Sequence, residues 1–427
     1  MRHLNHFKIW IDRLLQKPLV RGSLWLLLGK GLRVVLQATY FVMIARTLGV
    51  ENYGAFVGTT ALVGIVAPFV GLGLDTLLLK NVSKNRDLFR EHWGNTLLMI
   101  FVSGLGFIGV LVIAYPIILP RSISPLLIFL VAISDLIFGS ITLASERSFL
   151  AVDRPNISAQ INIFVMFGKV LAALSLASFF SQPNTLDWVY LYLFSSFVAA
   201  LLAISLVHTL LGTPKLALAR IKDEVAEGIY FSISTSAYTI YNDIDKTMLA
   251  RFATLQATGI YAAAYRLIDV AFIPVISIAG AAYAEFFRKG KDGVAATVAF
   301  AKPLVAITSL YSVVAGIGLF VLSPIVPQIL GDEYINVVVA LRWLAPIPLF
   351  RAMQHFGGDV LSGTGFQIFR SCAEVFVAVF NIAINLYLIP LYSWQGAAWA
   401  SLASDGLLMI MLWSLVAFQY HKQNYRI

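Results

Sequence analysis

Long apolar runs separated by short polar segments fill the sequence from residue 23 to residue 418. The hydrocarbon core of a bilayer is about 30 Å thick, so a helix needs roughly 20 apolar residues to cross it. Runs of this length predict twelve membrane-spanning helices, which cover residues 23–45, 53–74, 95–115, 125–145, 157–180, 188–210, 228–249, 258–284, 300–323, 337–358, 369–389 and 396–418. The pattern therefore predicts an all-α polytopic membrane protein.

Polar segments between these runs indicate how the chain is organised and oriented. The predicted segments are a cytoplasmic interfacial basic helix (1–22), a six-helix half (23–211), a cytoplasmic linker (212–227), a second six-helix half (228–418) and a cytoplasmic tail (419–427). The first segment combines five basic residues with one apolar helical face, as helices at a membrane surface do. Only Arg46, Arg121 and Arg251 fall in the segments that this topology places outside, so the positive-inside rule puts both termini in the cytoplasm.

Composition excludes several classes of protein. Charged residues make up 12% of the chain and hydrophobic residues 59%, whereas a soluble domain is roughly a quarter charged. The basic residues behind the net charge of +9 lie in short segments between the apolar runs, without a nucleic-acid-binding motif. Their placement therefore indicates the membrane topology, and no nucleic-acid partner is expected. Cys372 is the single cysteine, which excludes a disulfide framework and a cysteine-rich metal site.

The two halves share a short repeat. Met43-Ile44-Ala45-Arg46 leads to Gly54-Ala55-Phe56, and Met248-Leu249-Ala250-Arg251 leads to Gly259-Ile260-Tyr261. Both copies run from the outer end of the first span of a half into the second span. This equivalence of position predicts that a six-span unit was duplicated in parallel orientation, with a cavity between the copies.

The same region carries a family resemblance. The run Thr47-Leu48-Gly49-Val50-Glu51-Asn52-Tyr53-Gly54-Ala55-Phe56, the block Asp245-Lys246-Thr247-Met248-Leu249 with Gly259-Ile260-Tyr261-Ala262-Ala263-Ala264-Tyr265-Arg266-Leu267, and the turn Leu330-Gly331-Asp332-Glu333-Tyr334 together resemble the polysaccharide transporter family. These are lipid-linked oligosaccharide (O-antigen) flippases of the multidrug/oligosaccharidyl-lipid/polysaccharide superfamily. With the span count and the repeat, the resemblance covers nearly the whole chain.

The resemblance implies a fold of two pseudo-symmetric six-helix lobes around a central cavity. It also implies a flippase that carries an undecaprenyl-pyrophosphate-linked oligosaccharide from the inner to the outer leaflet, for lipopolysaccharide or exopolysaccharide assembly. The bacterial inner membrane is then the expected location, with membrane lipids around the chain. A polysaccharide polymerase and glycosyltransferases are expected partners by analogy alone.

Such a substrate needs cations for its pyrophosphate, and ionisable residues inside spans are expected to face a cavity. Lys30, Arg33, Gln37 and Tyr40 follow helical spacing and so share one face of the first span. Lys30 alone fits equally well a lysine that extends to the lipid headgroups. Arg33 lies deeper and is the favoured ligand.

Other spans add candidates to the same substrate site. Arg266 in the eighth span has Asp269 as its expected i,i+3 partner. A closed structural ion pair between them is therefore an equal alternative to a role of Arg266 in binding substrate. The tenth span contributes Arg342 and Arg351, with Pro346 as a bending point, and Asn381 in the eleventh suits sugar hydroxyls.

No cofactor or metal is expected, but coupling to protons or sodium is possible. A buried carboxylate is the natural carrier, and Glu374, Asp245 and Asp269 are the candidates. For Asp245, a structural ion pair is the stronger interpretation. A multidrug antiporter of the same superfamily is the nearest alternative, although basic lumen residues favour an anionic substrate. An integral membrane glycosyltransferase or polymerase is a distant one, because no large outer loop carries acidic catalytic residues.

Overall fold

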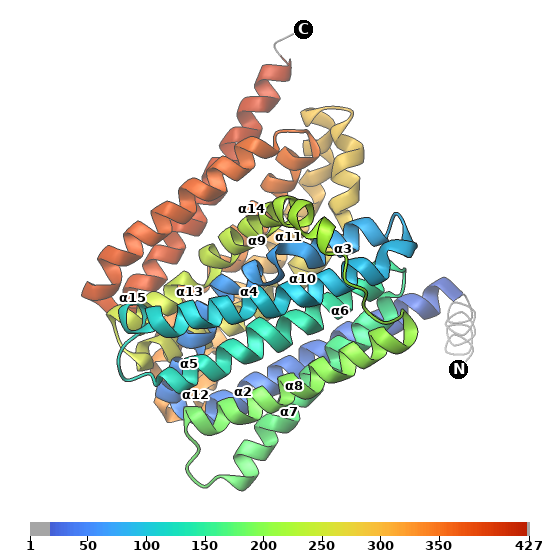
Figure 1. Cartoon of the computed structure of the whole chain (residues 1–427). Helices are drawn as coiled ribbons and strands as arrows, with labels where there is room; N and C mark the ends of the chain where they lie inside the picture. The colour runs from blue at the N-terminus through green and yellow to red at the C-terminus, as the bar shows by residue number, and fades with distance from the viewer. Residues whose placement is uncertain (1–17, 425–427) are drawn as a thin grey trace, which may run out of the picture.

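The computed structural model describes residues 18–424, with the side chains of residues 18–30, Ser234 and Asn424 outside the described set. Residues 1–17 of the interfacial helix predicted over residues 1–22 therefore lie outside the described residues. Every secondary-structure element in the described range is a helix, so the all-α prediction is confirmed (Figure 1).

Within the described residues, the N-terminal half contains ten helical elements. They are α2 (Pro18–Val66), η1 (Ala67–Gly73), α3 (Leu74–Val82), η2 (Arg86–Leu88), α4 (Phe89–Ile118), α5 (Pro125–Ala132), η3 (Ile133–Gly139), α6 (Ser140–Ala151), α7 (Pro155–Phe179) and α8 (Thr185–Leu210). Sequence sets several of these boundaries. At the start of α8, for example, the Asn184 side chain accepts hydrogen bonds from backbone N–H groups while Asp187 returns one, which forms a capping box.

The C-terminal half follows a short linker. Its elements are α9 (Leu218–Phe252), α10 (Leu255–Gly290), α11 (Val294–Leu322), η4 (Ser323–Ile325), α12 (Val326–Leu330), η5 (Asp332–Tyr334), α13 (Ile335–Leu344), α14 (Ile347–Gly363) and α15 (Gln367–Asn424). Thr254 caps α10 by accepting a hydrogen bond from the Ala257 N–H at 3.0 Å.

Two of these long helices are hairpins with two arms. The backbone leaves the helical region at Gly49 in α2 and at Ser393 in α15, both at positive φ. The ring centroids of Phe41 and Tyr53 are 6.0 Å apart, although twelve residues of straight helix span about 18 Å. Asn381 likewise donates to Ser404 at 3.0 Å, so α15 also folds back on itself.

Two breaks in the helices lie at glycine and proline residues, and the one at Pro346 is the bending point that the sequence predicted. In η1 the glycines Gly71 and Gly73 both have a φ of 76°, a left-handed conformation that glycine adopts without strain. The axis also bends by 44° between α13 and α14, at Pro346. Pro274 is different, because α10 continues through it.

Eight helical segments in the described chain are long and apolar enough to cross a membrane, and α13 with α14 would form a ninth. Two of them contain the hairpins of α2 and α15, so each of these supplies two arms. The 35-residue α9 does not meet the same criterion, and it carries Asp243, Asp245 and Lys246 near its C-terminal end. The total of twelve crossings and their grouping into two lobes stay predictions.

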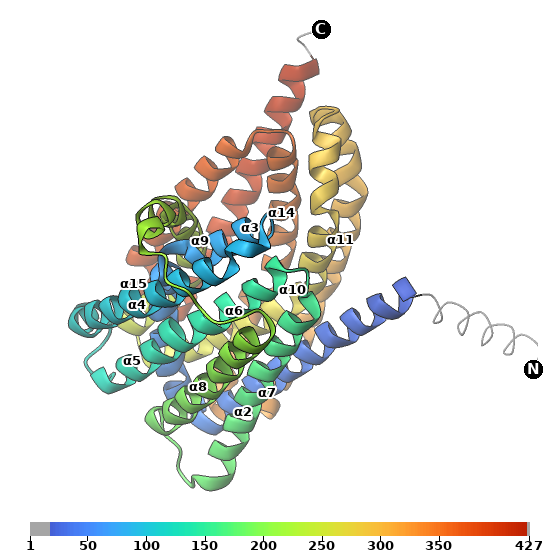
Figure 2. The same cartoon turned by 45° about the vertical axis from the view of Figure 1, so that its right-hand side comes forward.

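The two halves meet along α2, α9 and α10. In both views, helices α2 to α8 gather on one side, α11, α14 and α15 lie on the other, and α9 and α10 lie between them (Figures 1 and 2). One hydrophobic core joins residues of both halves, including Phe41, Leu62 and Tyr261. A second core lies wholly within α10, α11, α14 and α15. The contact between the halves is therefore a packed seam.

Candidate functional site

Glycines make the seam close. Gly54 in the second arm of α2 faces the backbone of α10, and a Cβ atom there would lie 1.8 Å from the Leu255 carbonyl oxygen. Gly259 in α10 faces α2, where a Cβ atom would lie 2.0 Å from the Val50 carbonyl oxygen. Gly54 and Gly259 are 205 residues apart, and so are Val50 and Leu255. The contact is thus reciprocal, as expected for equivalent positions of a duplicated unit around a two-fold pseudo-axis.

The repeated arginines make a second reciprocal contact. The Arg46 guanidinium donates to the Ile329 carbonyl oxygen at 3.2 Å, and the Arg251 guanidinium donates to the Leu119 carbonyl oxygen at 3.2 Å. Each arginine therefore reaches the connection after the third span of the opposite half. This geometry supports the repeat predicted from the sequence.

The third motif joins the same seam from α12 and η5. Glu333 Oε2 accepts a hydrogen bond from the Val50 N–H at 3.1 Å, at the start of the second arm of α2. The Tyr334 hydroxyl donates to the Ala45 carbonyl oxygen at 2.8 Å. The three motifs that carry the family resemblance are far apart in sequence but form one seam between the halves. The predicted topology places this seam toward the outside, so we use "outer seam" as a name for the contacts of Arg46, Val50, Gly54, Gly259 and Glu333.

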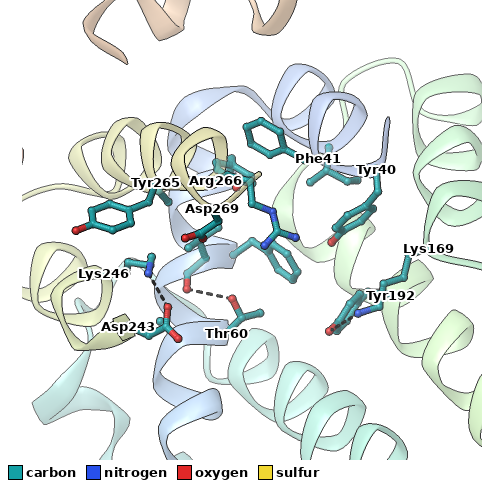
Figure 3. A pocket seen from close by; sticks show the side chains of 16 residues that line it. Tyr40, Phe41, Thr60, Lys169, Tyr192, Asp243, Lys246, Tyr265, Arg266 and Asp269 are labelled. Carbon is teal, nitrogen blue, oxygen red and sulfur yellow. Dashed lines mark hydrogen bonds and ion pairs between the residues drawn. The ribbon is translucent and has the colours of Figure 1, made fainter. Parts of the chain in front are cut away.

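A cavity of about 280 Å³ lies beside the outer seam, lined by α2, α7, α8, α9 and α10 (Figure 3). Its aromatic lining residues are Tyr40, Phe41, Tyr53, Phe56, Tyr192 and Tyr265. Its charged lining residues are Lys169, Asp243, Lys246, Arg266 and Asp269. The cavity thus combines aromatic faces with three cations and two carboxylates.

Two of the three cations are engaged. Lys246 Nζ lies 2.5 Å from Asp243 Oδ1 and 3.9 Å from Asp245 Oδ1. Lys169 Nζ donates to the Tyr192 hydroxyl at 3.3 Å, and that hydroxyl donates to Asp135 Oδ1 at 2.6 Å. Lys169 is therefore linked to the half-buried Asp135 carboxylate through the Tyr192 hydroxyl.

Arg266 is the cation without such a partner. Among the described residues it has no ion pair and no hydrogen bond, and Figure 3 shows its guanidinium extending into the cavity between Asp269 and Tyr40. The expected pair between Arg266 and Asp269 is wrong. Asp269 instead pairs with Arg351 of α14 at 3.3 Å, because Arg351 reaches the cavity wall from behind.

Arg351 is shared between two carboxylates. Its Nε lies 3.5 Å from Asp405 Oδ2 in the second arm of α15, and its guanidinium covers the Tyr265 ring at 5.3 Å. Asp405 also accepts hydrogen bonds from Tyr241 at 2.7 Å and from Gln354 at 3.1 Å. Arg351 therefore supports the cavity wall.

Other predicted ligands on α2 lie partly outside this cavity. Tyr40 lines it, whereas Arg33 is exposed and Gln37 is half-buried, and neither belongs to its lining. The side chain of Lys30 falls outside the described residues. Arg33 interacts electrostatically with Glu146 of α6.

The remaining predicted residues lie away from the cavity or behind its wall. Arg342 is exposed beside a different groove, between α11 and α13, so the expectation that it lines the central cavity is wrong. Asn381 is buried behind the wall, in a space of about 10 Å³ that Asp245 and Arg351 also border. Asp245 accepts a hydrogen bond from Tyr261, and Glu374 pairs with Arg370 at 2.8 Å.

Sequence reasoning did not include Asp243, Lys246, Tyr53 and Tyr192 among the site residues. Lys246 and Tyr53 stand within the motifs quoted for the resemblance, so those motifs were the available signal. Asp243 is an ionisable residue inside the predicted span 228–249, so its charge was a signal as well, whereas Tyr192 had none.

Comparison with known proteins adds the family. The sequence model of the family described as "Polysaccharide biosynthesis protein" matches residues 19–288. The chain belongs to this family. A sequence search of curated proteins gives no match.

Solved structures share the fold of this polysaccharide biosynthesis family member. The lipid II flippase MurJ in an inward closed conformation has a TM-score of 0.77 at 10% identity, with 91% of this chain and 87% of that chain covered. An inward-facing multidrug resistance transporter of the MATE family, in the MOP superfamily, has a TM-score of 0.72 at 15% identity, with 92% and 96% covered. An outward-facing structure from the MATE family gives 0.61 at 12% identity, with 92% and 95% covered. The TM-scores show that this chain shares the fold of these transporters.

Proposed function

We propose that this chain is a flippase that moves an undecaprenyl-pyrophosphate-linked oligosaccharide from the inner to the outer leaflet of the bacterial plasma membrane. One observation carries the proposal. The guanidinium of Arg266 lies in a cavity between the two halves with no carboxylate partner among the described residues. Arg266 is half-buried within a predicted membrane span, where a cation is costly unless water or an anion is present, so this position favours an anionic substrate group.

The other charged residues of the cavity also favour an anionic substrate. Both lining carboxylates already have a basic partner, Asp243 with Lys246 and Asp269 with Arg351. A drug cation would therefore have to displace an existing ion pair, whereas a pyrophosphate meets a free guanidinium. This difference favours the flippase over the multidrug antiporter.

The aromatic walls suit the glycan, because flat aromatic faces pack against the apolar faces of sugar rings. The volume of about 280 Å³ lies just below the roughly 300–1,000 Å³ typical of ligand sites. We therefore expect the cavity to widen around a glycan in an alternating-access cycle, with the lipid tail remaining in the membrane between the halves. Opening toward the outer leaflet would separate the outer seam.

Both termini in the cytoplasm, a polymerase and glycosyltransferases as partners, and coupling to protons or sodium belong to the same proposal. Asp269 is the best placed of the three coupling candidates, since it alone lines the cavity. Displacement of Arg351 from Asp269 by an incoming anion would free a carboxylate for a cation. Asp245 and Glu374 lie outside the lining.

The test is glycan display at the surface of the source strain. Deletion, wild type, Arg266→Ala and Arg266→Lys are compared at equal membrane levels of protein. Arg288→Ala is the matched control, because Arg288 lies on the same helix but is exposed and pairs with Glu285. Lipid-linked repeat units in the cytoplasmic leaflet are measured in parallel.

Loss of surface glycan with accumulation of lipid-linked precursor is expected for the deletion and for Arg266→Ala. Arg266→Lys keeps the charge and should retain part of the activity, and Arg288→Ala should behave as wild type. Normal glycan in the Arg266→Ala strain would remove the cationic site from the mechanism. Altered drug tolerance with intact glycan in the deletion strain would replace the flippase by the multidrug antiporter.

A further inference from the structure

A second, larger space opens on the outside of the C-terminal half. This groove of about 380 Å³ lies between α11 and the bend of α13 and α14. Its lining is apolar apart from Ser312 and Arg342. Val313 and Ile317 of α11 line it and are 41% and 59% exposed, so in a bilayer this face meets lipid. We call this space the lipid-facing groove.

Arg342 stands at one side of the lipid-facing groove. Its Nε donates to the Ser323 hydroxyl at 3.2 Å, and its guanidinium covers the Phe320 ring at 5.2 Å. Among the described residues it has no carboxylate within ion-pair distance, and the groove lining contains no acidic residue. An arginine on a lipid-facing surface is costly unless it reaches the headgroup layer or meets an anion.

The depth of Arg342 allows such a contact. It lies seven residues after Ile335, the start of α13, which is about 10 Å along a helix axis. The extended side chain covers most of that distance, so its guanidinium can meet a phosphate at the base of the headgroup layer.

We propose that the lipid-facing groove binds one anionic glycerophospholipid of the surrounding bilayer. Its phosphate contacts Arg342, and an acyl chain lies along Ile317 and Val313, which follow Phe320 along α11 away from the guanidinium. The single positive charge of Arg342 matches the single negative charge of a phosphodiester better than the higher charge of a pyrophosphate. The lining contains no acidic residue that could pair with the ammonium group of a zwitterionic lipid, so an anionic lipid is favoured. Because the lining includes Arg342 of α13 and Leu349 of α14, the lipid would contact both sides of the 44° bend.

The experiment is native mass spectrometry of the full-length protein released from detergent with phosphatidylglycerol, phosphatidylethanolamine or undecaprenyl pyrophosphate added. The variants are Arg342→Gln, which removes the charge, and Val313→Trp, which fills the groove at an exposed position. Arg121→Gln is the control, because Arg121 is an exposed arginine outside the groove. Thermal melts establish that each variant is folded.

One phosphatidylglycerol adduct is expected for wild type and Arg121→Gln, at several-fold higher occupancy than phosphatidylethanolamine. Arg342→Gln should remove that preference, and Val313→Trp should lower occupancy by both lipids. Equal occupancy by both phospholipids, or an unchanged preference in folded Arg342→Gln, overturns the proposal. Preferential retention of undecaprenyl pyrophosphate through Arg342 also overturns it and makes the groove a substrate site. None of these outcomes depends on the assignment of Arg266.

Discussion

The glycine contact in the outer seam predicts a measurable loss of stability. In Gly54→Ala the new Cβ would lie 1.8 Å from the Leu255 carbonyl oxygen, about 1.6 Å closer than ordinary contact allows. Both partners are backbone atoms, so no side-chain rotation can relieve the clash, and α2 must move away from α10. Gly259→Ala would meet the Val50 carbonyl oxygen at 2.0 Å and should have the same effect.

The size of the effect follows from two opposing contributions. Overpacking typically costs 1–3 kcal/mol, and a backbone clash belongs at the upper end. Alanine gains about 1 kcal/mol over glycine in a helix interior, so we expect a net loss of about 2 kcal/mol. Gly106→Ala in α4 is the control, since a Cβ there meets nothing within 4 Å. That variant should be as stable as wild type or slightly more stable.

The assay is thermal unfolding of the purified protein in lipid nanodiscs. Gly54→Ala and Gly259→Ala should each melt below wild type by a similar amount. The double variant should lose less than the two single losses together, because the first substitution already separates the helices. Equal melting of Gly54→Ala and Gly106→Ala would refute the close contact, and strict additivity would refute its reciprocity.

Two further predictions concern polar contacts between the halves. Glu333→Gln keeps an acceptor for the Val50 N–H but removes the negative charge at a helix N-terminus. Thermal unfolding should therefore show a loss of stability of about 0.3–1 kcal/mol. Glu333→Ala also removes the acceptor, so a loss of stability no larger than that of Glu333→Gln would contradict the capping role of Glu333. Glu224, which precedes the predicted seventh span, is buried; burial alone would raise the pKa of its carboxyl, but hydrogen bonds from His92 and Asn95 hold this pKa below the usual 4.5. The stabilisation by the ionised Glu224 carboxylate should therefore be complete above about pH 4.5 and should disappear as the pH falls through the lowered pKa. The difference in melting temperature between wild type and Glu224→Gln should then shrink on acidification. A constant difference between pH 7 and pH 3 would contradict this prediction.

Much of the fold was predictable, because apolar runs of span length need only local sequence. The break at Pro346 and the left-handed glycines of η1 were also accessible, since proline and glycine have specific backbone effects. The seam glycine Gly54 stood inside the repeat and the family motif, but its close approach to α10 follows only from the packed structure.

The site was less predictable because charge pairing across helices is non-local. Arg266 and Asp269 share a helix face, and the i,i+3 rule predicted their pairing. Asp269 pairs with Arg351 instead, 82 residues away in sequence. Arg342 shows the converse problem, because helical periodicity alone cannot tell a cavity-facing arginine from a lipid-facing one.

The repeat also separates what the two copies contribute to the cavity. At the spacing of 205 residues, Phe41 of α2 corresponds to Lys246 of α9, and Ala61 of α2 corresponds to Arg266 of α10. All four line the cavity, so the C-terminal copy supplies charge where the N-terminal copy supplies an aromatic or small side chain. The backbone contacts of the seam kept their reciprocity while these lining positions diverged. On the proposed function, the pyrophosphate would therefore lie against α9 and α10, and the uncharged glycan would extend toward α2.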